Sequence, residues 1–199
     1  VTQNTTGLGQ QVTLTVYNAC DEDSFTQTFD LLVGPVLDIT IDTNFVCTGN
    51  SISITNNSLG DNLTYIWTTN PSDGVVITNP GDPNPTIQFN GEIGEYSIMA
   101  EIGNEICGSV FWDTIILLNT VPEVTIDEIP PACDQITFTP IANYSIDQSF
   151  IDSVRWVFPP GSVPATSTAF DPGSVTQNTT GLGQQVTLTV YNACDEDSF

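Results

Sequence analysis

The chain has 199 residues, of which 24 are Asp or Glu and one is basic, and it contains no His. Its formal net charge of −23 excludes nucleic acid and anionic membranes as partners, because binding to either needs clusters of Lys and Arg. A hydrophobic content of 39%, with three Trp and ten Phe, excludes a disordered acidic tail.

Short segments of alternating polar and apolar residues follow one another along the chain, separated by Gly, Pro, Asn and Asp. They are rich in Val, Ile, Thr and aromatic residues, and none has helical periodicity, so each is predicted to form a strand. The sequence therefore predicts an all-β protein built from β-sandwiches. We expect strands at 9–18, 24–33, 36–41, 51–56, 63–69, 74–78, 85–89, 95–102, 109–118, 123–127, 135–140, 152–158, 174–178 and 183–192.

Residues 175–199 repeat residues 1–25 letter for letter, at an offset of 175 − 1 = 174. Chance does not produce an identity of this length, so we expect the 199 residues to be a window onto a tandem array with a 174-residue unit. Such arrays serve to extend a protein, to space its parts or to present a surface, since copying a catalytic site unchanged gains little.

The 174-residue unit is too long for one small sandwich and divides into two halves of about 87 residues. Each half has one Trp-bearing strand, and we expect Trp67 and Trp156 to lie in the core. Pro-containing joints occur at 33–35 and 119–122. The predicted domains are 1–34, the last two strands of a truncated sandwich; 35–120, a complete sandwich; and 121–199, a sandwich without its final strand. That strand would read as residues 26–33 do.

The Tyr-x-Trp strand at 65–67, the stretch from Phe89 to Tyr96 and the strand ending in Gly-Asn at 103–104 resemble Ig-like and PKD-like domains. With paired cysteines in Lys-poor repeats, the chain resembles the giant cell-surface adhesins of Bacteroidota, which include adhesins for gliding motility. The resemblance implies tandem Ig-like (PKD-like) sandwiches arranged end to end, and an extracellular location at the outer membrane.

The same resemblance implies a function: a structural stalk in a long adhesin used for attachment or gliding. Its partners would be neighbouring repeats of the same chain and, through other regions, an external surface or polysaccharide. The alternative is a repeated carbohydrate-binding module that acts through avidity. A glycan array distinguishes the two, because only the module gives a signal.

Five cysteines are distributed over these domains. In Ig topology, Cys47 and Cys133 precede the second strand, at the opposite end of the sandwich from Cys20, Cys107 and Cys194. Those ends lie about 20–25 Å apart, whereas bridged Cα atoms lie within about 7 Å. End-to-end domains bring Cys47 beside Cys194, so the resemblance favours this interdomain disulfide, with Cys20, Cys107 and Cys133 bonded outside the window.

The intradomain pairing of Cys47 with Cys107 and Cys133 with Cys194 is the alternative, and free thiols are a third. Either disulfide pairing implies an oxidising, extracellular compartment.

Catalytic residues are not expected. Without His and Lys the chain has no Ser-His-Asp triad, no Schiff-base Lys and no His-ligated zinc. No cofactor is expected either, although Ca²⁺ could bind carboxylates of the turn 21–23, or of its copy 195–197, near Glu123.

Asp followed by Ser or Thr and an apolar residue resembles the O-glycosylation signal of exported Bacteroidota proteins, and this marks Thr114, Ser153 and Ser24. In the pair Phe111 and Trp112, one ring should be exposed, because successive strand residues face opposite sides.

Overall fold

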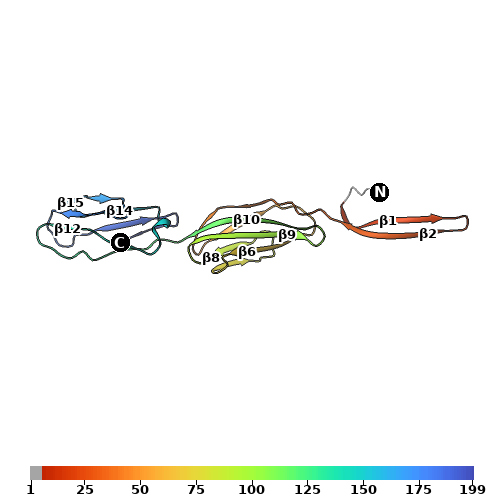
Figure 1. Cartoon of the computed structure of the whole chain (residues 1–199), viewed down its shortest axis with the longest axis horizontal. Coiled ribbons are helices and arrows are strands. Elements are labelled where there is room, and N and C mark those ends of the chain that lie inside the picture. The colour runs from red at the N-terminus through yellow and green to blue at the C-terminus, as the bar shows by residue number, and fades with distance from the viewer. Residues whose placement is uncertain (1–5) are drawn as a thin grey trace. The chain divides into compact units, whose positions relative to one another are not determined.

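The computed structural model describes residues 6–199, so residues 1–5 of the first repeat copy lie outside the described residues. Over this range the protein is all-β, with no α-helix and one turn of 3₁₀ helix, η1 (Gln148–Phe150) (Figure 1). The strands are β1 (Gly7–Tyr17), β2 (Glu22–Leu31), β3 (Ile39–Ile41), β4 (Phe45–Cys47), β5 (Ser51–Asn56), β6 (Thr64–Asn70), β7 (Val75–Thr78), β8 (Thr86–Phe89), β9 (Gly94–Asn104), β10 (Gly108–Asn119), β11 (Val124–Ile126), β12 (Ile136–Phe138), β13 (Ala142–Tyr144), β14 (Ser153–Val157), β15 (Ser162–Val163), β16 (Thr166–Ser167), β17 (Val175–Gln177), β18 (Thr187–Tyr191) and β19 (Glu196–Ser198).

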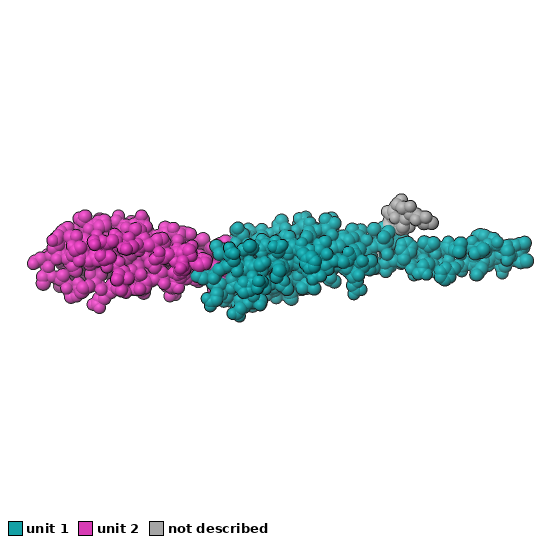
Figure 2. Space-filling view, in the orientation of Figure 1, with its two compact units in different colours: residues 1–44, 49–117 teal, residues 45–48, 118–199 magenta. Residues whose placement is uncertain are grey.

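The chain forms two compact units (Figure 2). The first comprises residues 1–44 and 49–117, and the second comprises residues 45–48 and 118–199. The short segment around Cys47 thus belongs to the same unit as the C-terminal segment. The boundaries at 34 and 120 drawn from the sequence stay predictions.

The first unit begins with a hairpin in which β1 pairs antiparallel with β2, from Tyr17 opposite Glu22 to Gly7 opposite Leu31. The turn is closed by the side chain of Asn18, whose Oδ1 accepts the backbone N–H of Cys20 at 2.7 Å and of Asp21 at 3.0 Å. Most residues of both strands are exposed. The hairpin is therefore held by its backbone ladder rather than by an apolar core.

The sandwich core of the first unit is built by strands in which buried residues largely alternate with more exposed ones, as in β5 and β8. The sheet β3-β5-β8-β7 buries Ile52 and Ile87, each 0% exposed, and in β9, which pairs with β6, Ile98 and Ile102 are also 0% exposed. Each sheet hides one face, as expected when two sheets pack together. The hydroxyl of buried Tyr96 donates to the Glu92 carbonyl at 2.8 Å, a corner typical of Ig-like sandwiches.

The second unit repeats this plan with shorter strands. Its sheets are β11-β13, β12-β17-β15 and β16-β14-β18-β19. Trp156 is fully buried, and its Nε1 donates to the Ala169 carbonyl at 3.0 Å. The core consists of Val124, Ile151, Val154, Trp156, Phe158, Val175, Leu188 and Val190.

Some predicted boundaries differ from the structure. The segment 9–18 lies almost wholly in β1, which runs from Gly7 to Tyr17, but the matching prediction at 183–192 is observed only as β18, Thr187–Tyr191. A strand needs a partner for its backbone groups, and residues 181–186 face no strand in the described part of the chain. Strands β4, β13, β15, β16 and β19 were not predicted, because two or three residues are too few to show alternation.

Candidate functional site: the disulfide of the second unit

A disulfide joins Cys47, at the end of β4, to Cys194 in the turn between β18 and β19. Their Cα atoms lie 5.6 Å apart although the residues are separated by 147 positions. This is the pairing that the sequence favours. Cys47 and Cys194 belong to one compact unit, so the expectation that this disulfide joins two domains stays a prediction.

The turn that carries Cys194 is built by its own sequence. The Oδ1 of Asn192 accepts the N–H of Cys194 at 2.9 Å and of Asp195 at 3.2 Å, as Asn18 does in the first copy. An Asn side chain that mimics a backbone turn in this way fixes where the next residues point. The sulfur of Cys194 is therefore presented by a preformed turn.

One backbone and two side-chain hydrogen bonds hold the segment at the end of β10 and after it beside the segments that carry the disulfide. The carbonyl of Asn119 accepts the N–H of Thr48, next to Cys47, at 2.8 Å. The Nδ2 of Asn192 donates to the Thr120 carbonyl at 2.7 Å, and Asp197 Oδ2 accepts the N–H of Val124 at 2.8 Å. Residues 119–124 are thus held by hydrogen bonds to the segments that carry the two bonded cysteines.

The alternative pairing of Cys47 with Cys107 and Cys133 with Cys194 was wrong, because Cys47 and Cys194 bond to each other. Within residues 6–199, Cys20, Cys107 and Cys133 are exposed free thiols. The Sγ of Cys107 lies 3.7 Å from the Leu32 carbonyl oxygen, beside the joint at 33–35. Bonds from these three cysteines to other domains stay a prediction.

In the acidic turns, Asp carboxylates accept hydrogen bonds from backbone N–H groups of the same turn. Asp21 Oδ1 accepts the N–H of Glu22 at 2.8 Å, and Asp195 Oδ1 accepts that of Glu196 at 2.9 Å. In the described range no group of three or more His, Cys, Asp or Glu is placed to hold a metal. Calcium near Glu123 stays a prediction, and a melting curve repeated with excess EDTA tests it.

The three glycosylation candidates differ in exposure. Ser153 and Ser24 are exposed, whereas Thr114 is half-buried on the face of β10 that carries buried Ile116. A glycan needs a side chain that reaches solvent, so the structure favours Ser153 and Ser24 over Thr114. Modification at any of them stays a prediction.

Of the tryptophans, Trp67 is 2% exposed and Trp156 is 0% exposed, so both lie in cores. Trp112 packs edge-on against Trp67, with ring centroids 6.1 Å apart, and leaves Phe111 72% exposed. The exposed ring expected in this pair is Phe111.

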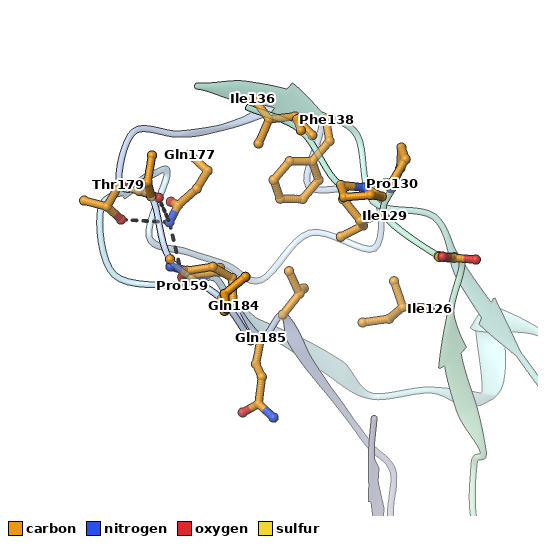
Figure 3. A pocket seen from close by; sticks show the side chains of 18 of the residues that line it. Ile126, Ile129, Pro130, Ile136, Phe138, Pro159, Gln177, Thr179, Gln184 and Gln185 are labelled. Atoms are coloured by element: carbon orange, nitrogen blue, oxygen red, sulfur yellow. Dashed lines mark hydrogen bonds between the residues drawn. The ribbon is translucent and has the colours of Figure 1, made fainter. Parts of the chain in front are cut away.

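A groove of about 920 Å³ opens in the second unit (Figure 3). The sequence does not predict this groove directly, although the final strand expected to be missing from residues 121–199 was a signal for it. Its lining is mainly apolar and includes Ile126, Ile129, Ile136, Phe138, Leu182 and Val186.

No helix in residues 6–199 is long and apolar enough to cross a bilayer.

No family model matches the chain, and no curated protein sequence matches it. Among solved structures it is similar to the I-band fragment I67–I69 of titin, at 11% identity and a TM-score of 0.62, covering 96% of this chain and 72% of that one. An E-to-A variant of the same titin domains has 11% identity, a TM-score of 0.61 and the same coverage. The two-domain structure DIP-gamma IG1+IG2 has 12% identity and a TM-score of 0.45, covering 83% of this chain and 94% of that one. The fold is that of tandem immunoglobulin-like sandwiches, as the sequence predicts.

Proposed function

We propose that the chain is a repeated segment of the stalk of a long extracellular adhesin, with a mechanical role. The observation that carries the proposal is the disulfide Cys47–Cys194, in a chain whose ends repeat each other. A repeated unit that is fastened covalently suits spacing and load-bearing better than chemistry.

The disulfide changes the path of a pulling force. When the chain is pulled at its ends, tension passes from Cys47 through the sulfur bridge to Cys194, because this is the shortest covalent route. The 147-position interval between them is bypassed. The β-structure of both units within this interval can then open without lengthening the chain, which is useful in a fibre under load.

Charge supports an extended array in an aqueous setting. Removing the duplicated Asp195, Glu196 and Asp197 leaves −23 + 3 = −20 for each 174-residue unit. Like charges keep neighbouring chains apart over about 8 Å at physiological salt. Together with the disulfide, this suits an oxidising space outside the cell.

The setting in Bacteroidota and the use in attachment or gliding rest on the sequence resemblance, for which the gliding-motility adhesin SprB is the model. The anchor and the adhesive surface would lie in other regions of such a protein.

One observation favours the alternative, a carbohydrate-binding module: the ring of Phe111 is 72% exposed on β10. Exposed aromatic rings offer an apolar face to sugars. A glycan array probed with the full chain decides between the candidates. The stalk gives no signal, whereas the module gives one that Phe111→Ser abolishes.

Pulling on the chain by its two ends tests the load path. We expect the oxidised chain to extend only through residues outside the disulfide loop. Reduction should add about 500 Å, since 147 residues contribute about 3.4 Å each. Cys47→Ser should reach the longer extension without reductant, while equal extensions in all three cases would contradict the proposal.

A further inference from the structure

We infer that the exposed face of β6, β9 and β10 docks a segment of another protein that presents apolar side chains together with Lys or Arg. This face carries five exposed apolar residues: Ile66, Met99, Phe111, Ile115 and Leu117. All five belong to the first unit and lie between positions 66 and 117, so the ends of the sequence do not create the face. Such docking does not depend on the proposed mechanical role of the chain.

Strand pairing places residues of β6 and β9 on one side of the sheet. β6 pairs with β9, and β9 lies next to β10 (Figure 1). Trp67 and Ile98 point into the core. Because successive residues of a strand face opposite sides, their neighbours Ile66 and Met99 point outward, and they are 54% and 39% exposed.

The outward side of β10 continues this apolar surface. Phe111, Ile115 and Leu117 are separated by even numbers of residues, so they share one side of the strand. Ile116 and Leu118 alternate with them and are fully buried on the other side. Three neighbouring strands thus contribute apolar side chains to one exposed face.

The second unit has polar residues at the equivalent positions. Aligning the two core tryptophans matches Ile66 to Arg155, and aligning the cysteines after β9 and β18 matches Phe111 to Ser198. Arg155 and Ser198 both pair with Thr189, so they form one row across that sheet. A sandwich of this plan therefore forms with a polar row here. The apolar side chains of the first unit are not required by the fold, and such exposed patches mark interaction sites.

Two carboxylates among these apolar side chains indicate the charge of the partner. Glu101 lies opposite Ile66 in the β6–β9 pair, and Asp113 follows Phe111 by two residues on the same side of β10. The first unit has no Lys, Arg or His, since the one basic residue of the chain, Arg155, belongs to the second unit. A partner that brings Lys or Arg beside apolar side chains complements both features of the face.

The same carboxylates disfavour a second copy of this chain as the occupant. Two such faces packed together would oppose Glu101 and Asp113 to further carboxylates, in molecules with a net charge of −23 each. A sugar is also a poorer match, because sugars stack on aromatic rings and the only ring among the five apolar residues is Phe111. Mixed aliphatic and aromatic side chains are typical of the centre of a protein–protein interface.

The test uses the full chain and a capped helical peptide of about 18 residues, made of Leu, Lys and Ala, with Lys along both edges of its Leu stripe. Fluorescence anisotropy of the labelled peptide measures binding. We expect saturable binding that weakens as salt rises, because the charges are partly screened. A second peptide with Glu in place of every Lys should not bind.

Phe111→Ser tests the apolar part of the face. It should weaken binding of the Lys peptide by about tenfold or more, since an exposed ring at the centre of a contact contributes strongly. The matched control is Val76→Ser, because Val76 is 53% exposed on β7, in the other sheet. This control should bind within about twofold of the parent.

A double variant, Glu101→Gln with Asp113→Asn, tests the charged part. It should weaken binding at low salt by about threefold or more. Glu22→Gln with Asp23→Asn removes the same charge from the exposed strand β2 and should leave binding unchanged within about twofold. Equal losses in the two double variants would show attraction to net charge alone and would overturn the inference.

Other results also overturn the inference. These are no binding of the Lys peptide, equal binding of the Glu peptide, or equal losses for Phe111→Ser and Val76→Ser. A glycan-array signal that Phe111→Ser abolishes assigns the face to a sugar instead. Concentration-dependent association of the chain that Phe111→Ser abolishes assigns it to a second copy.

Discussion

Leu188 is completely buried, whereas Leu14, at the same place in an identical stretch of sequence, is 63% exposed. The two residues have the same neighbours in the chain, and each lies in a strand of an antiparallel pair. They differ in what covers them, because Leu188 packs in the core of the second unit while the hairpin around Leu14 has no such core. Burial here is a property of the tertiary setting.

This pair allows a matched mutational test. Leu188→Ala should destabilise the second unit by about 2–5 kcal/mol, because it leaves a cavity in a packed core. Leu14→Ala should change the free energy of unfolding by less than about 0.5 kcal/mol. Urea denaturation of both variants measures the difference, and similar losses would show that the first copy is also packed.

The disulfide should contribute strongly to the stability of the second unit. Closing a loop of 147 residues, which includes residues 49–117 of the first unit, restricts the chain once both units unfold, and the loop-entropy relation then gives about 5 kcal/mol. Cys47→Ser should therefore lower the denaturation midpoint of this unit, as reductant does with the parent chain. Cys20→Ser is the control, since that thiol is free and exposed. An unchanged midpoint for Cys47→Ser would refute the prediction.

Stability should fall at alkaline pH because of Tyr96. Burial, together with the negative charges of Glu92 and Asp73, raises the pKa of its hydroxyl above the ordinary value of 10.0. A raised folded-state pKa favours the neutral folded form, so this stability is complete below pH 10 and is lost as the pH rises through the folded pKa.

Tyr96→Phe should remove this part of the alkaline loss. It should also cost about 1 kcal/mol at neutral pH, since the hydrogen bond to the Glu92 carbonyl disappears. Urea denaturation between pH 8 and about 11.5 measures both effects. Tyr17→Phe, at a residue that is 71% exposed, is the control and should keep the pH profile of the parent.

Cys107 of one copy of the repeat should form a disulfide with Cys133 of another, as Cys194 does with Cys47. The pair corresponds to Cys194 and Cys47, at offsets of 194 − 107 = 87 and 133 − 47 = 86.

Glutathione disulfide serves as the oxidant in this test. It takes up the two electrons and two protons released by the two thiols and becomes two glutathione thiols. Peptide mapping under non-reducing conditions should find Cys107 bonded to Cys133, and Cys133→Ser should abolish the oligomers. Cross-links formed equally often through Cys20 would contradict this pairing.

Sequence alone was enough for the all-β class and for most of the longer strands, because a strand with one buried face alternates in sequence, as at Ser51–Asn56. The sequence also showed the repeat. It showed the turn-forming Asn residues as well, whose side chains accept hydrogen bonds from backbone groups two and three residues further along the chain. These are local properties, and local patterns record them.

Only the tertiary structure decided which copy of the repeat is buried and how much of 183–192 becomes strand. It also showed the groove and the grouping of Cys47 with residues that follow 118. Each of these depends on segments distant in sequence that supply a covering face or a pairing edge. The identical sequences around Leu14 and Leu188 therefore do not indicate which of the two residues is buried.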